Sequence, residues 1–287
     1  MTRPDPIAII ACGGRFALEC IEEGRRADRV ARVIALDGES LPEVLAIADD
    51  VVKWGQIGRL ISALEASGAR HVLLIGSISQ RPDFRTLVGD FETLKWLPRL
   101  LTTMAGGDDS VLRKVIGFFE GGGYEVVSVA DVAPALLAEA GALTRQKPSA
   151  EDRTDIALGF QVLSALAPFD VGQSLVVGDG RVAAVEAAEG TDAMIERIAE
   201  VRAARRVAWR DRAGLLVKSA KTGQDLRVDL PVIGPATVDR CVTAGLSGIV
   251  LGAGRVAIAS KRECLERADQ AGLFIFAQSD PVDGKPS

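Results

Sequence analysis

Short apolar stretches alternate with helical patterns through the first half of the chain. The apolar stretches occupy residues 6–11, 30–38, 71–77 and 124–129, and the helical patterns lie at 16–27, 56–68 and 84–119. Strands that alternate with helices along a chain pair into a parallel sheet covered by helices. Ligands of such sheets bind at the carboxyl ends of the strands. The alternation therefore predicts an α/β fold and directs the search for a site to the loops that follow the strands.

Two of these loops carry residues suited to a phosphate or a sugar. The first, "CGGR", ends a strand at Gly13 and Gly14 and precedes a helix, whose N-terminal amides attract anions. The second, "GSISQRPDF", brings two hydroxyl groups and Arg81 to the same edge. A tight strand-to-helix turn and an ordinary polar loop explain the two segments equally well. The candidate ligand-binding residues are Gly13, Gly14, Arg15, Gly76, Ser77, Ile78, Ser79 and Gln80.

The second strand ends at Asp37, where a dinucleotide-binding fold places the acid that binds its ribose. This position favours a Rossmann-like N-terminal domain. It also raises a nicotinamide-dependent oxidoreductase as one alternative function. The first loop lacks the third glycine of G-x-G-x-x-G, which counts against that alternative.

The apolar periodicity lapses around "LTRQKPSAEDRTD", a polar stretch that contains a proline. Beyond it we expect a helix at 154–166, and then a hairpin whose "GDG" turn separates two apolar runs. The chain is therefore predicted to form two α/β domains. The predicted bounds are 1–142 for the Rossmann-like domain, 143–153 for a linker, 154–278 for a catalytic α/β domain and 279–287 for a mobile tail.

Composition excludes several classes of function. The net charge is −5 and no basic block occurs, so nucleic acid is not an expected partner. The one histidine, His71, begins an apolar strand, so we expect a structural role for it, and a zinc site with several histidines cannot be built. No apolar run reaches the ~20 residues that cross a bilayer. Four scattered cysteines are typical of a reduced, cytosolic protein.

In the second half, carboxylates lie where apolar strands end. Period-two alternation along "RVAAVEAAEGTD" predicts that Glu186 shares a face with Val182 and Ala184. A carboxylate in so apolar a strand needs a cation or several donors, because burying it unpaired costs several kcal/mol. Thr191 and Asp192 follow just before a helix, where capping is the alternative explanation. Capping does not account for Glu186.

The stretch "KSAKTGQDLRVDLPVIGP" begins at Lys218 and carries charges of both signs. If extended, it places Asp225, Arg227 and Asp229 on one face at spacings of about 6–7 Å. Lysine and arginine neutralise phosphate oxygens, and paired aspartates hold a hard cation such as Mg²⁺. An exposed, salt-bridged edge strand explains the alternation as well. The polar clusters "DVGQS" and "VEAAEGTD", also at strand ends, favour a diphosphate and metal site.

Five blocks of the chain are distinctive in combination: "IAIIACGGRFAL", "LLIGSISQRPDF", "DVGQSLVV", "VAAVEAAEGTDAMIER" and "VKSAKTGQDLRVDLPVIGPATV". Together they resemble the LpxI-type UDP-2,3-diacylglucosamine pyrophosphatases of lipid A biosynthesis over nearly the whole chain. The resemblance implies hydrolysis of UDP-2,3-diacylglucosamine to UMP and lipid X, with water attacking the sugar-side phosphate. It also implies Mg²⁺ or another divalent cation, a site between two domains and a homodimer. Asp225 stands at the aspartate of the "QD-x-R" block that the family treats as essential.

The residues and the resemblance together assign roles to particular side chains. Asp225 is expected to hold the metal or to orient the attacking water, with a second carboxylate nearby. The predicted catalytic residues are Asp225, Asp192, Lys218, Lys221 and Arg227. The predicted metal ligands are Asp225, Glu186 and Glu189, and the further substrate contacts are Gln173, Thr191 and Gln224.

The two acyl chains of such a substrate need an apolar surface. The stretch "FETLKWLPRLLTTM" (91–104) could line a channel or touch a membrane surface transiently, although packing of an ordinary core helix is the simpler explanation. The expected location is the cytoplasm, either free or peripherally at the inner membrane. A protein that binds the UDP-sugar lipid without turnover is the second alternative, but it gives no reason for so many charged groups around a diphosphate.

Overall fold

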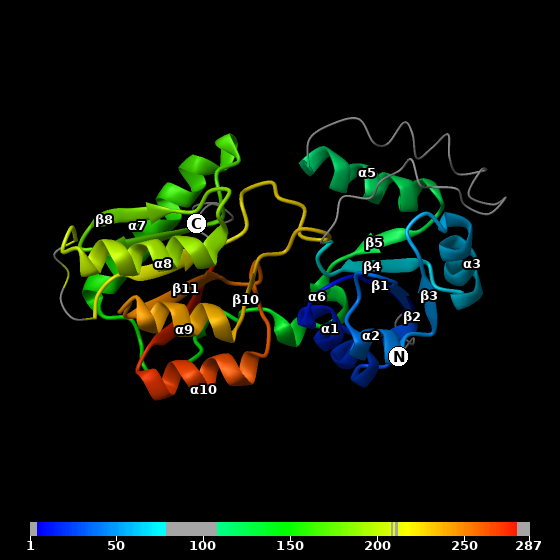
Figure 1. The fold of residues 1–287 in the computed structure, drawn as a ribbon, viewed down its shortest axis with the longest axis horizontal. Coiled ribbons are helices and arrows are strands. Elements are labelled where there is room, and N and C mark those ends of the chain that lie inside the picture. Colours follow the sequence, from blue (N-terminus) through cyan, green and yellow to red (C-terminus); the bar gives the residue numbers. More distant parts are fainter. Residues whose placement is uncertain (1–4, 79–107, 208, 210–211, 280–287) are drawn as a thin grey trace, which may run out of the picture. The chain divides into compact units, whose positions relative to one another are not determined.

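The computed structural model describes residues 5–78, 108–207, 209 and 212–279 (Figure 1). The chain divides into two compact units, Met1–Pro134 and Ala135–Ser287. The division falls before the predicted linker at 143–153, and helix α7 (Ala150–Leu166) already begins within that stretch. Within the described residues, no helix is both long enough and apolar enough to cross a membrane.

The first unit contains a five-stranded sheet of order β3-β2-β1-β4-β5, in which every pairing is parallel. Its strands are β1 (Ile7–Ala11), β2 (Val30–Leu36), β3 (Asp50–Val52), β4 (His71–Ile75) and β5 (Glu125–Val127). This confirms the predicted Rossmann-like parallel sheet. The chain moves from β1 outward to β3 and then returns to β4 on the other side of β1, so the strand order reverses between β1 and β4. Sheets of this kind bind ligands at such a switch point.

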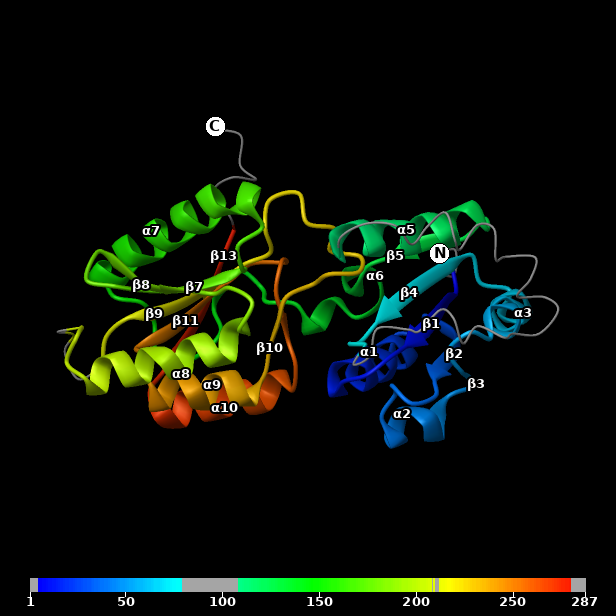
Figure 2. The same ribbon diagram turned by 45° about the horizontal axis from the view of Figure 1, so that its top comes forward.

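Helices cover both faces of this sheet, with α1 and α2 on one face and α5 on the other (Figure 2). The helices of this unit are α1 (Arg15–Arg26), α2 (Pro42–Ile47), α3 (Ile57–Ser67), α5 (Asp108–Gly121) and α6 (Val129–Val132). Helix α1 buries Ala17, Cys20, Ile21 and Gly24, which recur at helical spacing along one face. Helix α3 ends at Gly68, whose left-handed φ of 66° stops the helix as the sequence predicted.

The second unit is built on a six-stranded mixed sheet of order β6-β13-β11-β9-β7-β8. Its strands are β6 (Gly141–Ala142), β7 (Ser174–Gly178), β8 (Arg181–Val185), β9 (Leu215–Lys218), β11 (Gly248–Gly252) and β13 (Phe274–Gln278). Strands β9, β11 and β13 are parallel, whereas β7 runs antiparallel to both β8 and β9. Two short strands, β10 (Val232–Ile233) and β12 (Ala257–Ile258), pair separately. A second α/β domain, as predicted, is confirmed.

The six-stranded sheet lies between two helical layers (Figure 2). Helix α7 covers one face, where Ile156 and Phe160 pack against apolar side chains of β7, β9 and β11. The other face is covered by α8 (Gly190–Ala203), α9 (Pro235–Thr243) and α10 (Lys261–Ala271). Both faces of this sheet are covered by apolar packing. Polar groups can therefore gather only at the ends of the strands and in the loops that follow them.

The β7–β8 hairpin turns at "GDG" as predicted, with positive φ at Asp179 and Gly180. A β-bulge, however, interrupts the pairing between Val176 and Val177. Val182 packs on the face of the sheet that α7 covers, and Ala184 packs on the opposite face, under α8. The prediction that both share a face with Glu186 is therefore wrong. The extra residue of the bulge reverses the alternation, which a strict period of two cannot foresee.

Candidate functional site

The loops after β1 and β4 meet at the switch point of the first sheet. The Gly13 N–H donates to the Ser77 carbonyl at 2.8 Å, and the Ser77 N–H donates to the Gly13 carbonyl at 2.8 Å. Gly14 caps α1 with a φ of 97°, and its neighbour Arg15 is exposed, as is Ile78 on the other loop. The structure thus brings together the predicted residues of both loops from 13 to 15 and from 76 to 78. Ser79, Gln80, Arg81 and the stretch 91–104 lie outside the described residues.

Glycine is needed at two of these positions because the loop backbones nearly touch. A Cβ atom on Gly13 would lie 2.9 Å from the Ser77 carbonyl oxygen. A Cβ atom on Gly76 would lie 2.5 Å from the Gly13 carbonyl oxygen, and Gly76 also has a φ of +105°. A tight turn and a ligand-binding loop both need this close approach of backbone.

Gly76→Ala is expected to lower the free energy of unfolding by about 2–4 kcal/mol, because the new methyl group meets backbone atoms and the residue is held at positive φ. Urea denaturation measures the change. Gly117→Ala is the matched control, because Gly117 is exposed on α5 and a methyl group added there would meet no atom within 4 Å. The control should be neutral or stabilising by about 0.5–1 kcal/mol. Equal stability of the two variants would contradict the close approach of the loops.

Three strand ends meet at one edge of the second sheet. Because a hairpin is antiparallel, the start of β7 at Ser174 lies beside the end of β8 at Val185. Strand β9 ends at Lys218, which pairs in register with Ser174. Glu186 follows β8 directly, and its N–H donates to the Ser174 carbonyl at 3.0 Å. The topology brings Ser174, Glu186 and Lys218 to the same edge.

Side-chain hydrogen bonds join these strand ends into one buried cluster, the Glu186 network. Glu186 is 7% exposed, and its Oε2 accepts from the Ser174 hydroxyl at 2.7 Å and from the Gln173 N–H at 3.2 Å. Its Oε1 accepts from the Thr191 hydroxyl at 3.0 Å. The Lys218 ammonium donates to Thr191 Oγ1 at 2.8 Å. The network consists of Gln173, Ser174, Glu186, Thr191 and Lys218.

Lys218 is the cationic member of this network and is 5% exposed. Burial lowers the pKa of its ammonium, while the nearby charges of Glu186 and Asp192 act in the opposite direction. An ammonium has three N–H donors, and Thr191 takes one of them. In the described part of the chain, no carboxylate lies within 4 Å of its Nζ, as no ion pair to Lys218 is formed. A buried cation with donors to spare is suited to an incoming anion.

Thr191 and Asp192 do not cap helix α8. The N-cap position is held by Glu189, and no side chain accepts a hydrogen bond there. Asp192 instead forms an ion pair with Arg240 at 3.1 Å and accepts from the Thr237 hydroxyl at 3.3 Å. Capping, the alternative explanation for Thr191 and Asp192, is therefore wrong.

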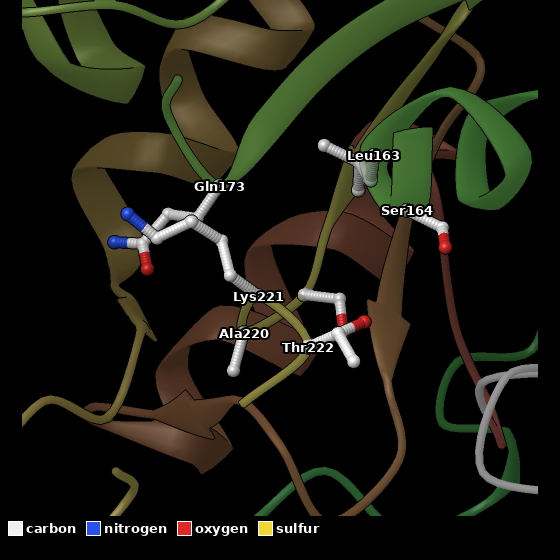
Figure 3. Close-up of a pocket in the computed structure, with 7 residues that line it drawn as sticks. Leu163, Ser164, Gln173, Ala220, Lys221 and Thr222 are labelled. Atoms are coloured by element: carbon white, nitrogen blue, oxygen red, sulfur yellow. The ribbon is translucent and has the colours of Figure 1, made fainter. Parts of the chain in front are cut away.

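A second group of predicted residues adjoins the Glu186 network through Gln173. The Gln224 amide donates to Gln173 Oε1 at 3.4 Å, and Gln224 Oε1 accepts from the Lys221 N–H at 2.7 Å. The Lys221 ammonium forms an ion pair with Asp170. A small hollow lies beside these groups, between the end of α7 and the loop after β9 (Figure 3). Its lining residues are Leu163, Ser164, Gln173, Ser219, Ala220, Lys221 and Thr222.

The segment from Asp225 to Asp229 is a turn, which contradicts the extended conformation considered above. The N–H groups of Val228 and Asp229 donate to the Asp225 carbonyl at 3.3 and 3.1 Å. The Arg227 N–H donates to Asp225 Oδ1 at 3.1 Å, so the aspartate side chain itself stabilises the turn. The Arg227 guanidinium also binds both oxygens of Asp225, and this contact lowers the pKa of that carboxyl.

The three predicted metal ligands do not form a cation site in this structure. Asp225 is bound by Arg227, Glu189 is paired with Arg197 at 2.8 Å, and Glu186 is held by its three donors. Across the residues that the structure describes, no three His, Cys, Asp or Glu side chains gather closely enough to hold a metal ion. A cation bound by these three would have to displace existing partners at each of them.

Three polar residues at this edge are not among the predicted site residues, although two of them, Asp170 and Ser174, belong to the polar cluster "DVGQS". Ser174 opens the apolar run "SLVV", a position that could have signalled a side chain at the strand end. Ser219 follows Lys218 directly; its hydroxyl is buried and has no hydrogen-bond partner in the described part of the chain. Asp170, which has a φ of 57°, forms an ion pair with Lys221, a residue 51 positions away in the sequence. A local sequence pattern cannot predict such a contact.

The fold and these clusters define a class of two-unit α/β proteins with a parallel-sheet unit followed by a mixed-sheet unit. Residues 6–136 match the LpxI N-terminal domain, and residues 139–276 match the LpxI C-terminal domain. The chain belongs to the LpxI family. It is 37% identical over 270 residues to the UDP-2,3-diacylglucosamine pyrophosphatase LpxI of Caulobacter vibrioides, an alignment that covers 94% of this chain and 96% of the relative.

Proposed function

We propose that this protein is a hydrolase that cleaves the diphosphate of UDP-2,3-diacylglucosamine to UMP and lipid X in lipid A biosynthesis. The observation that carries the proposal is the match along 94% of the chain to a pyrophosphatase named for this substrate. The clustering of predicted site residues at one sheet edge supports it, because Lys218, Lys221 and Gln173 lie together there.

In this reaction the oxygen of water bonds to the sugar-side phosphorus. The bond from that phosphorus to the bridging oxygen breaks, and UMP leaves with the bonding electron pair. Charge spreads over the phosphoryl oxygens and the leaving oxygen, so catalysis depends on positioned cations and donors. Lys218 and Lys221 would supply them, and Asp225, kept ionised by Arg227, would orient the water and accept its proton.

Three finer features remain predictions of the proposed function, namely a requirement for Mg²⁺ or another divalent cation, a homodimer, and transient contact with the membrane surface. Light scattering on the purified protein measures its mass, and sedimentation with anionic lipid vesicles measures its membrane binding. The cation requirement is read from the activity assay with and without chelator.

The activity assay incubates purified protein with UDP-2,3-diacylglucosamine and Mg²⁺, with and without EDTA, and measures UMP. We expect equal amounts of UMP and lipid X, and loss of both with EDTA. If the protein binds the substrate but releases no UMP, even when the protein is in excess over substrate, the hydrolase function is excluded. The alternative of a protein that binds the UDP-sugar lipid without turnover is then favoured. If turnover persists in EDTA, only the predicted requirement for a divalent cation is contradicted.

A further inference from the structure

We propose that Glu186 and Thr191 are positioning residues for Lys218, in which Thr191 holds the ammonium and Glu186 orients Thr191 without binding a metal ion. The inference deepens the proposed function and rests on it in one respect, that Lys218 is the group that meets the diphosphate. It is drawn from the hydrogen bonds of the Glu186 network.

Thr191 can satisfy both neighbours in only one arrangement. A threonine hydroxyl has a single O–H donor and two acceptor lone pairs. The ammonium of Lys218 can only donate, and the carboxylate of Glu186 can only accept. The O–H therefore points to Glu186 Oε1 at 3.0 Å, and a lone pair faces Lys218 Nζ at 2.8 Å. Glu186 thus fixes the direction from which Thr191 accepts the lysine.

Glu186 is fixed in turn by two donors on its other oxygen. The Ser174 hydroxyl lies 3.4 Å from Thr191 Oγ1 but only 2.7 Å from Glu186 Oε2, so its one proton goes to the carboxylate. The Gln173 N–H adds a second bond to Oε2 at 3.2 Å. Both oxygens of a carboxylate that is 7% exposed are therefore occupied by protein donors. Burial and these three donors leave Glu186 little room to join the six oxygen ligands that Mg²⁺ requires.

The network holds a lysine that would otherwise be hard to place. A lysine side chain loses up to about 2 kcal/mol of rotamer freedom when it is fixed, and burial disfavours its charge. A purely structural buried lysine is expected to touch a carboxylate. Lys218 instead touches a neutral hydroxyl, and the negative charges of Glu186 and Asp192 act on it from a distance. The ammonium therefore stays available for an anion from outside.

Variants at Thr191 test the positioning role. Thr191→Val removes the hydroxyl at nearly constant volume and is expected to lower kcat for UMP release by about 10–10²-fold, because small misplacement of a catalytic group is costly. Thr191→Ser keeps the hydroxyl and should stay within about threefold of the wild type. Thr144→Val is the control, since Thr144 is similarly buried and bonds to the backbone of Gln146 and Ile275. The control should lose stability and keep kcat.

Glu186→Gln separates positioning from metal binding. We expect a lower kcat, with an unchanged Mg²⁺ concentration for half-maximal rate, because Glu186 is not a ligand. Recovery of the rate at high Mg²⁺ would overturn the inference, as would wild-type kcat in Thr191→Val or no rescue by serine.

A crystal structure of Thr191→Val gives a readout independent of activity, in which Lys218 Nζ is expected to leave its present position. An ammonium that stays in place would also overturn the inference. If the wild type proved inactive but Lys218 still moved in the crystal structure of Thr191→Val, the result would contradict the proposed function and leave the positioning role intact.

Discussion

Asp225→Asn is expected to lower kcat/KM for UMP release by about 10²-fold or more, while the free energy of unfolding changes by no more than about 1 kcal/mol. The substitution keeps the shape of the side chain and removes its charge. In the wild type Arg227 binds both carboxylate oxygens and lowers the pKa of Asp225, so the side chain is a fixed negative charge that can orient the attacking water. A neutral amide cannot accept the proton and holds the water less strongly.

The control for this prediction is Asp50→Asn. Asp50 also pairs with an arginine, Arg32, but the pair joins β2 and β3 in the first unit. The control removes an arginine-bound carboxylate of similar exposure and should leave the rate unchanged. Wild-type rates for Asp225→Asn would show that the carboxylate of Asp225 has no part in the reaction, even with the hydrolase itself intact.

The parallel sheet of the first unit could be predicted because its evidence is local. Each long strand is an apolar run bounded by glycine or by charge, and each helix shows its own period, as α3 does up to Gly68. The short strand β3 and the short helix α2 were both missed. Their positions depend on pairing with β2, which is a tertiary contact.

The candidate site shows the same division between local and distant causes. The burial of Lys218 was readable, since it ends the apolar run "GLLVK". That Glu186 needs donors was also readable from the sequence. That Ser174 and Thr191 supply two of them was not, because the contact with Ser174 depends on the pairing of β8 with β7. The turn at Asp225 was hidden by an alternation of charged and aliphatic residues that is typical of a strand. The Asp225 side chain accepts a hydrogen bond from the backbone N–H two residues further on. This local bond stabilises a turn in place of the extended strand that the alternation predicts.

Lys218→Met is expected to lower the rate of UMP release by about 10³-fold and to leave the protein at least as stable as the wild type. Loss of one positioned donor to a developing charge accounts for rate losses of about 10²–10³-fold, and here a full positive charge is lost with it. Methionine has a similar unbranched side chain and carries no charge to desolvate. If Lys218 instead served mainly to neutralise Glu186, removing it would destabilise the fold by about 3–5 kcal/mol.

The pH dependence of stability distinguishes these two roles of Lys218. Because burial lowers the pKa of Lys218 below its ordinary 10.5, the unfolded chain binds more protons than the folded one between the lowered pKa and 10.5. The wild type should therefore gain stability relative to Lys218→Met as pH rises through that window. The excess stability of the variant over the wild type should be largest at pH values below the window. Urea denaturation of both proteins from pH 7 to pH 10 measures the difference. A wild type that is more stable at pH 7 and loses that lead as pH rises would mean a raised pKa, and so a lysine whose charge serves the fold rather than an arriving diphosphate.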